Sequence, residues 1–171
     1  MPATTPITTD NRLARAASLC DNNDDDPSSK TNSGLFAYGT LTMDAVMLTL
    51  LDRVPPSERT TAPGWRAAGL PDLPYPGLVA DPQSNALGRL YLDLTEREWA
   101  LLDAFENPVY DIAAVTLANG QRGLAYVWPV TDPPALAHTW TVDLIDPAGV
   151  EAYLARCKLW RQEWEAENIN S

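Results

Sequence analysis

The chain has 171 residues, an apolar content of 45% and a formal net charge of −11, from 12 Lys and Arg against 23 Asp and Glu. This length fits one globular domain that folds without disulfides or metals. The negative charge argues against nucleic acid and against anionic membrane surfaces as partners, because both attract clustered Lys and Arg. No apolar run approaches the ~20 residues that span a bilayer, so we expect no membrane segment.

The N-terminal residues 1–33 are rich in Thr, Asn, Asp and Ser and hold few large apolar side chains. Burial of such a segment does not offset the entropy lost on ordering, so we expect a disordered acidic and polar tail before a domain at 34–171. The Asp and Asn residues of 21–26 alternate as in a calcium loop, but Asp26 stands where that loop requires glycine. A solvated acidic segment is therefore the better interpretation.

The chain has two cysteines, Cys20 in the polar tail and Cys157 on an apolar helical stripe. A structural bridge between such positions is not expected, and the N-terminus lacks the continuous apolar core of a secretory signal. A reducing compartment fits best, so we expect a cytoplasmic protein.

An apolar, strand-like run at 35–38 breaks at Gly39 and reopens into a helical pattern over 41–51. A glycine turn followed by a helix N-terminus can direct backbone N–H groups at one anion, either a phosphate or a carboxylate. Alternatively, the glycine is ordinary punctuation and Thr40 or Thr42 caps the helix. The further glycines and the lysine of a phosphate-binding loop are absent, which favours a carboxylate.

Prolines crowd the passage from Pro55 to Pro82. This density predicts irregular loops broken by short edge strands, with Trp65 and Leu70 packed beneath them. The clean apolar and polar alternation over 88–94 then predicts a half-buried strand.

A capping box, in which Thr95 and Glu98 each satisfy an amide, predicts a helix that Asn107-Pro108 ends. Glu106 therefore lies at the helix C-terminus, where the helix dipole disfavours a negative charge and raises the pKa of a carboxylate. That direction suits a general base near neutral pH. Glu106 could also be a solvated helix-end residue, and Asp103, one turn earlier, is a rival carboxylate.

Two β-rich runs, 112–117 and 122–128, flank Asn119-Gly120 and predict a hairpin. Asp146 and Pro147 predict the cap and the first residue of a last helix. The apolar stripe of that helix is Val150, Tyr153, Leu154, Cys157, Trp160 and Trp164.

Several chemistries are disfavoured by the residues themselves. His138 is the only histidine, so a Ser-His-Asp or Cys-His arrangement would depend on it alone. The chain has neither a Gly-x-Ser-x-Gly elbow nor the ligand spacing of a zinc site, and the position of Cys157 indicates core packing rather than a nucleophile. An anion-binding turn plus one carboxylate, Glu106, suggests a zwitterionic substrate that resembles an amino acid.

Motifs follow one another in a characteristic order through the globular part. They are Phe36–Leu41, Tyr75–Val79, Gly88–Tyr91, Leu102–Glu106 with Tyr110, and Ala125–Trp128. In order and spacing they resemble the γ-glutamylcyclotransferase-like (AIG2-like) family. The segment Tyr153–Lys158 with Trp160-Arg161 is similar to the C-terminal helix of the plant and fungal AIG2-like branch, so the resemblance covers roughly residues 34–165.

The resemblance implies an α+β fold with a small mixed β-barrel, closed or nearly closed, flanked by helices and with a pocket at one end. It implies that Glu106 is the catalytic general acid and base, and that the turn before the first helix binds a γ-glutamyl moiety through backbone amides. The residues that it assigns to substrate binding are Tyr38, Gly39, Thr40, Leu41, Tyr110 and Tyr126.

The implied activity is cyclisation of a γ-glutamyl amine or peptide to 5-oxoproline with release of an amine. We expect no cofactor and no metal, because the nucleophile is the α-amine of the substrate itself. The expected partner is a small molecule that carries a carboxylate.

One departure from the family bears on the substrate. Many members carry an arginine two residues after the tyrosine that matches Tyr110, and this chain has Ile112. The Asn107-Pro108-Val109 link is also an unusual pocket wall. Two other readings therefore stay open: cofactor-free acid–base chemistry on a non-glutamyl metabolite of a biosynthetic pathway, and a non-catalytic module that binds a small molecule.

Overall fold

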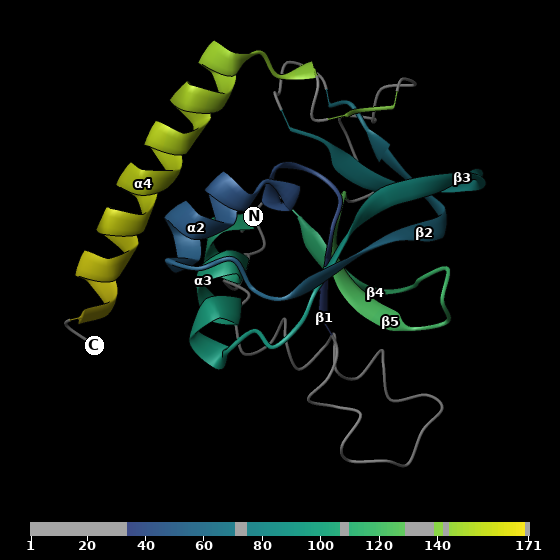
Figure 1. Ribbon diagram of the computed structural model, residues 1–171, viewed down its shortest axis with the longest axis horizontal. Coiled ribbons are helices and arrows are strands. Elements are labelled where there is room, and N and C mark those ends of the chain that lie inside the picture. Colours follow the sequence, from purple (N-terminus) through teal and green to yellow (C-terminus); the bar gives the residue numbers. More distant parts are fainter. Residues whose placement is uncertain (1–33, 71–74, 107–109, 129–138, 142–143, 170–171) are drawn as a thin grey trace, which may run out of the picture.

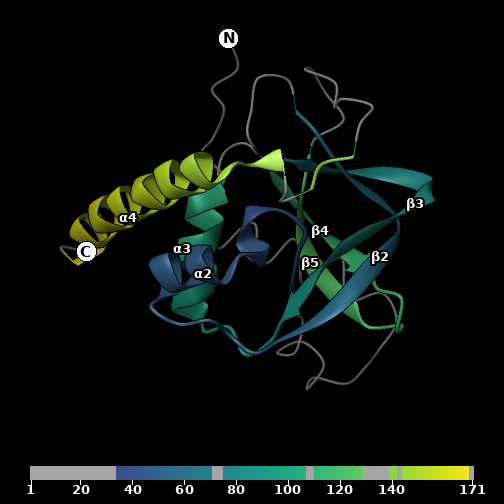
Figure 2. The same cartoon turned by 45° about the horizontal axis from the view of Figure 1, so that its top comes forward.

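The structure, a computed structural model, describes residues 34–70, 75–106, 110–128, 139–141 and 144–169. The expected tail at 1–33, His138 and the Asn107-Pro108-Val109 link lie outside the described residues. Within the described part, five strands form one sheet and three α-helices lie together on one side of it, as Figures 1 and 2 show. The predicted α+β class is confirmed.

The strands are β1 (Gly34–Ala37), β2 (Ser57–Ala68), β3 (Gly77–Tyr91), β4 (Asp111–Thr116) and β5 (Arg122–Val127). The helices are the 3₁₀ helix η2 (Thr40–Thr42) and the α-helices α2 (Asp44–Leu51), α3 (Glu96–Glu106) and α4 (Pro147–Ile169). The sheet order is β2-β3-β1-β5-β4, in which the central β1 runs parallel to β5 and antiparallel to β3. Beyond the short β1, β3 meets β5 directly, with Leu78 opposite Val127.

The sheet is curled so that its two ends approach each other. The amide of Ala118, in the turn after β4, donates to the carbonyl of Thr61 on β2 at 3.0 Å. The amide of Trp140 donates to the carbonyl of Ala67 at 2.8 Å and so covers part of the β2 edge. These contacts make the sheet the small, nearly closed barrel that the resemblance implied.

The central strand β1 is apolar throughout because both of its faces are covered. Leu35 and Ala37 pack into the cluster shared with the helices, whereas Phe36 points into the barrel interior with Leu78 and Leu90. This alternation places one strand between two cores. Packing on both faces thus fixes the position of β1, and the residues that follow its last residue, Ala37, begin the candidate site.

The prediction of irregular loops through the proline-rich passage is wrong. Residues 57–91 form mainly the two long strands β2 and β3, which pair from Ser57 opposite Tyr91 to Ala68 opposite Gly77. Pro63 is tolerated because β2 is an edge strand with a register shift beside it, at Gly64, whose φ is +84°.

The predicted helix caps and the predicted hairpin are confirmed. The amide of Thr95 donates to Glu98 Oε1 at 2.9 Å, and the amide of Glu98 donates to Thr95 Oγ1 at 3.1 Å, which is the predicted capping box. Asp146 caps α4 by accepting from the amide of Gly149 at 2.6 Å. The predicted hairpin forms between β4 and β5, with Gly120 at φ +84° in its turn.

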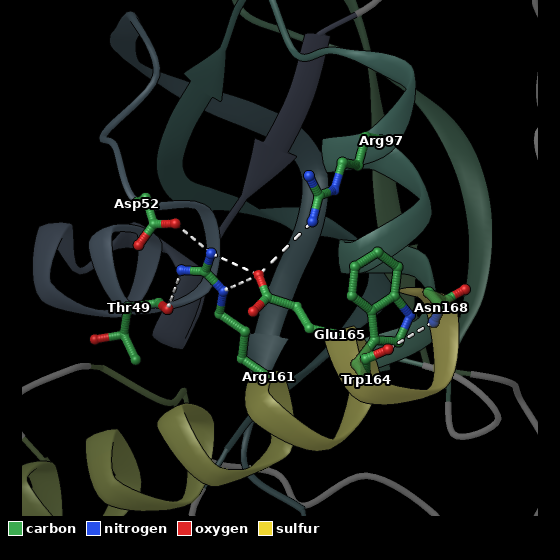
Figure 3. A network of polar contacts seen from close by, with 7 residues as sticks. All are labelled: Thr49, Asp52, Arg97, Arg161, Trp164, Glu165 and Asn168. Carbon is green, nitrogen blue, oxygen red and sulfur yellow. Dashed lines mark hydrogen bonds and ion pairs between the residues drawn. The ribbon is translucent and has the colours of Figure 1, made fainter. Parts of the chain in front are cut away.

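A network around Arg161 fixes α4 against the other helices (Figure 3). The guanidinium pairs with Asp52, just after α2, and donates to Glu165 at 2.8 Å and to the carbonyl of Thr49 at 3.2 Å. Arg97 of α3 lies 3.7 Å from Glu165. The hydrogen bond from Arg161 lowers the pKa of Asp52, and Asp52 in turn raises the pKa of Arg161.

We expect Arg161→Met to lower the free energy of unfolding by about 1 kcal/mol, measured by urea denaturation at pH 7. The loss comes mainly from the bonds at Thr49 and Glu165, because Asp52 is 74% exposed and water screens its charge. Since the folded-state pKa of Asp52 is depressed, its contribution is complete above the unfolded pKa, about 3.9, and disappears as the pH falls through the folded pKa.

The matched control is Lys158→Met, which removes one positive charge from an exposed site on the same helix. Equal losses of stability in the two variants would show that the Arg161 network does not hold α4 in place.

Candidate active site

A cavity of about 260 Å³ opens at the carboxyl ends of the parallel strands β1 and β5. All the residues predicted for the site line it, namely Tyr38, Gly39, Thr40, Leu41, Glu106, Tyr110 and Tyr126. They come from separate elements: the segment after β1, the end of α3, the start of β4 and the end of β5. The structure therefore brings the predicted residues together, while their chemical roles stay predictions.

The turn after β1 is a 3₁₀ helix rather than the start of α2. The amide of Thr42 donates to the carbonyl of Gly39 at 3.0 Å, and the Thr42 hydroxyl donates to the same carbonyl at 2.6 Å. The alternative in which Thr40 or Thr42 caps the helix is wrong, since α2 begins after Met43 without a side-chain cap. The first N–H groups of a 3₁₀ helix have no acceptor within it, and here they belong to residues that line the cavity.

Two hydroxyls hold this turn in place. Tyr91, whose side chain is buried, donates to the carbonyl of Leu41 at 2.8 Å. The hydroxyls of Thr40 and Tyr153 lie 2.9 Å apart and share a hydrogen bond. The turn is thus attached to β3 on one side and to α4 on the other.

Gly39 allows a close approach between the turn and the segment before β3. A Cβ atom at this position would lie 2.8 Å from Cγ and 3.0 Å from Cδ of Pro76. The carbonyl of Pro76 accepts a hydrogen bond from the hydroxyl of Tyr110 at 2.5 Å, and the hydroxyl of Tyr38 donates to the carbonyl of Tyr126. Tyrosine hydroxyls therefore connect the pieces of chain that make the cavity wall.

Glu106 is the last residue of α3 and the only carboxylate among the described residues that line the cavity. Burial raises the pKa of Tyr38 and of Tyr110, and the negative charge of Glu106 raises both further. These hydroxyls consequently stay protonated and neutral beside the carboxylate. The rival, Asp103, is 1% exposed and is not among the described lining residues.

Helix α4 supplies one wall of the cavity, which the sequence did not reveal. The lining residues that were not predicted are Leu35, Phe36, Ala37, Tyr75, Pro76, Phe105, Tyr153, Arg156, Cys157 and Trp160. Phe105 and Trp160 meet edge to face, with ring centroids 5.0 Å apart. The hydroxyl of Tyr153 was a usable signal, because a buried hydroxyl on an apolar stripe needs a partner.

Ile112 is 6% exposed, packs in the core cluster shared with the helices and lies opposite Tyr126 in the β4–β5 ladder. It therefore adds no positive charge to the cavity. In the part of the chain that the structure describes, no cluster of His, Cys, Asp or Glu could hold a metal ion. No helix in the same part is long and apolar enough to cross a bilayer.

A protein-family model described as γ-glutamyl cyclotransferase, AIG2-like, matches residues 35–142. The chain belongs to this family. The predicted resemblance is therefore confirmed, and the family match ends before α4.

Curated relatives and solved structures agree with this assignment. AIG2-like protein D of Arabidopsis thaliana is 26% identical over 139 residues, which cover 78% of this chain and 91% of that protein. AIG2-like protein C of the same plant is 31% identical over 118 residues, which cover 66% of this chain and 69% of that protein. Two solution structures of Arabidopsis thaliana proteins, each 21% identical, share the fold. The first has a TM-score of 0.57 and covers 87% of this chain and 92% of its own. The second has a TM-score of 0.55 and covers 74% of this chain and 88% of its own.

We expect Gly39→Ala to destabilise the protein by roughly 1–3 kcal/mol, because the new methyl group forces the turn and Pro76 apart. Thermal unfolding measures the loss. Pro76→Ala removes both ring atoms that the methyl group would meet but keeps the backbone carbonyl that Tyr110 uses. The double variant should regain part of the lost stability, and strictly additive losses would contradict the contact.

We expect Cys157 to react slowly with iodoacetamide in the folded protein at pH 8. Its side chain is 1% exposed, and burial raises the pKa of the thiol to about 11, so little thiolate is present. Mass spectrometry of the peptide that contains Cys157 measures alkylation with and without urea. Equal rates in the two conditions would show an accessible, activated thiol instead of a core residue.

Proposed function

We propose that the chain is an enzyme that cyclises the γ-glutamyl group of a small amine or peptide to 5-oxoproline and releases the amine. The observation that carries this proposal is that a turn with N–H groups left over and Glu106 line one cavity. Glu106 is the one carboxylate among the described residues that line it. Family membership supports the same class of chemistry.

The two features suit the two charges of a γ-glutamyl group. The N–H groups at the start of η2, including those of Thr40 and Leu41, are donors for the α-carboxylate. Glu106 is an acceptor for the α-ammonium group. The tyrosine hydroxyls around them are neutral, so they add no negative charge that would compete for the ammonium group.

Glu106 would begin the reaction by accepting a proton from the α-ammonium group. The freed amine attacks the γ-carbonyl carbon, a C–N bond forms, and the tetrahedral intermediate collapses as the bond to the leaving nitrogen breaks. Two protons leave the attacking nitrogen and two reach the leaving nitrogen, with Glu106 carrying them in turn. The products are 5-oxoproline and the released amine in its protonated form, so the step needs no oxidant, reductant or further reactant.

The main task of the cavity is to fold the substrate into the five-membered approach. Holding the α-carboxylate at one end and the amine beside Glu106 places the amine near the γ-carbonyl, and such orientation accelerates ring closure strongly. Aromatic side chains, among them Phe105, Tyr110 and Trp160, line the cavity around the reacting groups.

We expect Glu106→Gln to reduce the release of 5-oxoproline by about 10²–10⁴-fold, because it keeps the shape of the side chain and removes the base. The assay uses a panel of γ-glutamyl amino acids, γ-glutamylamines and glutathione. Glu96→Gln is the matched control, since Glu96 lies exposed on the first turn of the same helix.

Undiminished release from Glu106→Gln would refute the mechanism. Binding of a γ-glutamyl compound by the unaltered protein without any turnover would favour a binding module. Silence in both assays would favour a different, non-glutamyl substrate.

A further inference from the structure

Arg156 is the one cationic side chain among the described residues that line the cavity. It lies on α4, a helix that follows the segment matched by the family model. Its guanidinium carbon lies over the ring of Tyr153, 5.6 Å from the ring centroid. The position of this charge is therefore set by an aromatic side chain of the cavity itself.

Arg156 has no ion-pair partner among the described residues, which distinguishes it from most arginines of that part of the chain. Paired arginines are Arg53 with Glu98, Arg66 with Asp81, Arg89 with Asp44, Arg97 with Glu165, and Arg161 with Asp52 and Glu165. In a chain with a net charge of −11, carboxylates are abundant. A guanidinium at a cavity mouth without one is free to bind an anionic ligand.

The contacts across the cavity show which end of a ligand Arg156 faces. Thr40, in the turn, is 6% exposed and bonds the hydroxyl of Tyr153. The Tyr153 ring comes next, and Arg156 lies over that ring and is exposed to solvent. Since Arg156 is exposed and Thr40 is buried, the guanidinium lies nearer to solvent than the turn does.

We propose that Arg156 binds a carboxylate on the amine half of the substrate, so that the enzyme prefers γ-glutamyl amino acids and peptides to γ-glutamylamines without a carboxylate. The inference rests on the proposed function. If the turn and Glu106 hold the γ-glutamyl group, the leaving amine extends toward the mouth, where the guanidinium can form two parallel hydrogen bonds with a carboxylate. The local positive charge also offsets the repulsion between an anionic substrate and the negative chain.

The decisive comparison uses γ-glutamylalanine and γ-glutamylethylamine, which differ only by the carboxylate of the leaving group. Release of 5-oxoproline gives kcat and KM for the unaltered protein, Arg156→Gln, Arg156→Lys and the control Lys158→Gln. Lys158 is exposed on the same helix and is not among the described residues of the cavity, so this control removes the same charge elsewhere.

We expect Arg156→Gln to lower kcat/KM for γ-glutamylalanine about 10-fold, mainly by raising KM, since a charge-assisted contact is lost. The kcat/KM of Arg156→Gln for γ-glutamylethylamine should stay within about twofold of that of the unaltered protein. Arg156→Lys should restore part of the loss for γ-glutamylalanine. Lys158→Gln should leave kcat/KM for both substrates unchanged. Added salt should reduce the preference of the unaltered protein for γ-glutamylalanine, because salt screens an exposed ion pair.

Equal losses for the two substrates in Arg156→Gln would overturn the inference, because Arg156 would then act on the shared γ-glutamyl half or through Tyr153. Unchanged kinetics for both would overturn it as well. If the unaltered protein turns over neither substrate nor any other γ-glutamyl compound of the panel, the proposed function fails and the inference falls with it. If both activities depend on Glu106 but neither changes in Arg156→Gln, the inference fails while the proposed function stands.

Discussion

The site depends on the point where the chain leaves β1 between β3 and β5. At that point a short 3₁₀ helix is held from two sides, by the bond from Tyr91 to the carbonyl of Leu41 and by the bond between Thr40 and Tyr153. Because these two bonds use a carbonyl and a side-chain hydroxyl, they leave the first N–H groups of the 3₁₀ helix for a ligand. Gly39 completes the arrangement by letting Pro76 pack against the turn.

The cavity wall that adjoins this turn comes from α4, which Arg161 fixes against the other helices (Figure 3). The same helix contributes both a contact to the turn, through Tyr153, and a charge at the mouth, through Arg156. A helix fixed in this way links the stability of the packed helices to the shape of the cavity. If Arg156 binds the leaving half of the substrate as proposed, α4 sets the substrate range of the chain.

Much of the fold was predictable because its signals are local. The capping box at Thr95 and Glu98, the cap at Asp146 and the β4–β5 hairpin each depend on residues only a few positions apart. The long strands between Pro55 and Pro82 were not predictable, since proline is tolerated there only because β2 is a sheet edge. The role of α4 as a cavity wall was missed for a similar reason: an apolar stripe does not say which neighbour it faces.

In the proposed complex, the cavity holds a γ-glutamyl group by both of its charges, with the carboxylate at the turn and the amine at Glu106. The most direct test is a crystal structure of the Glu106→Gln variant with γ-glutamylalanine bound. We expect the α-carboxylate within hydrogen-bond distance of the Thr40 and Leu41 amides, with the α-amine beside residue 106. A ligand bound in the reverse direction, with its α-carboxylate on Arg156 and its α-amine far from residue 106, would contradict it.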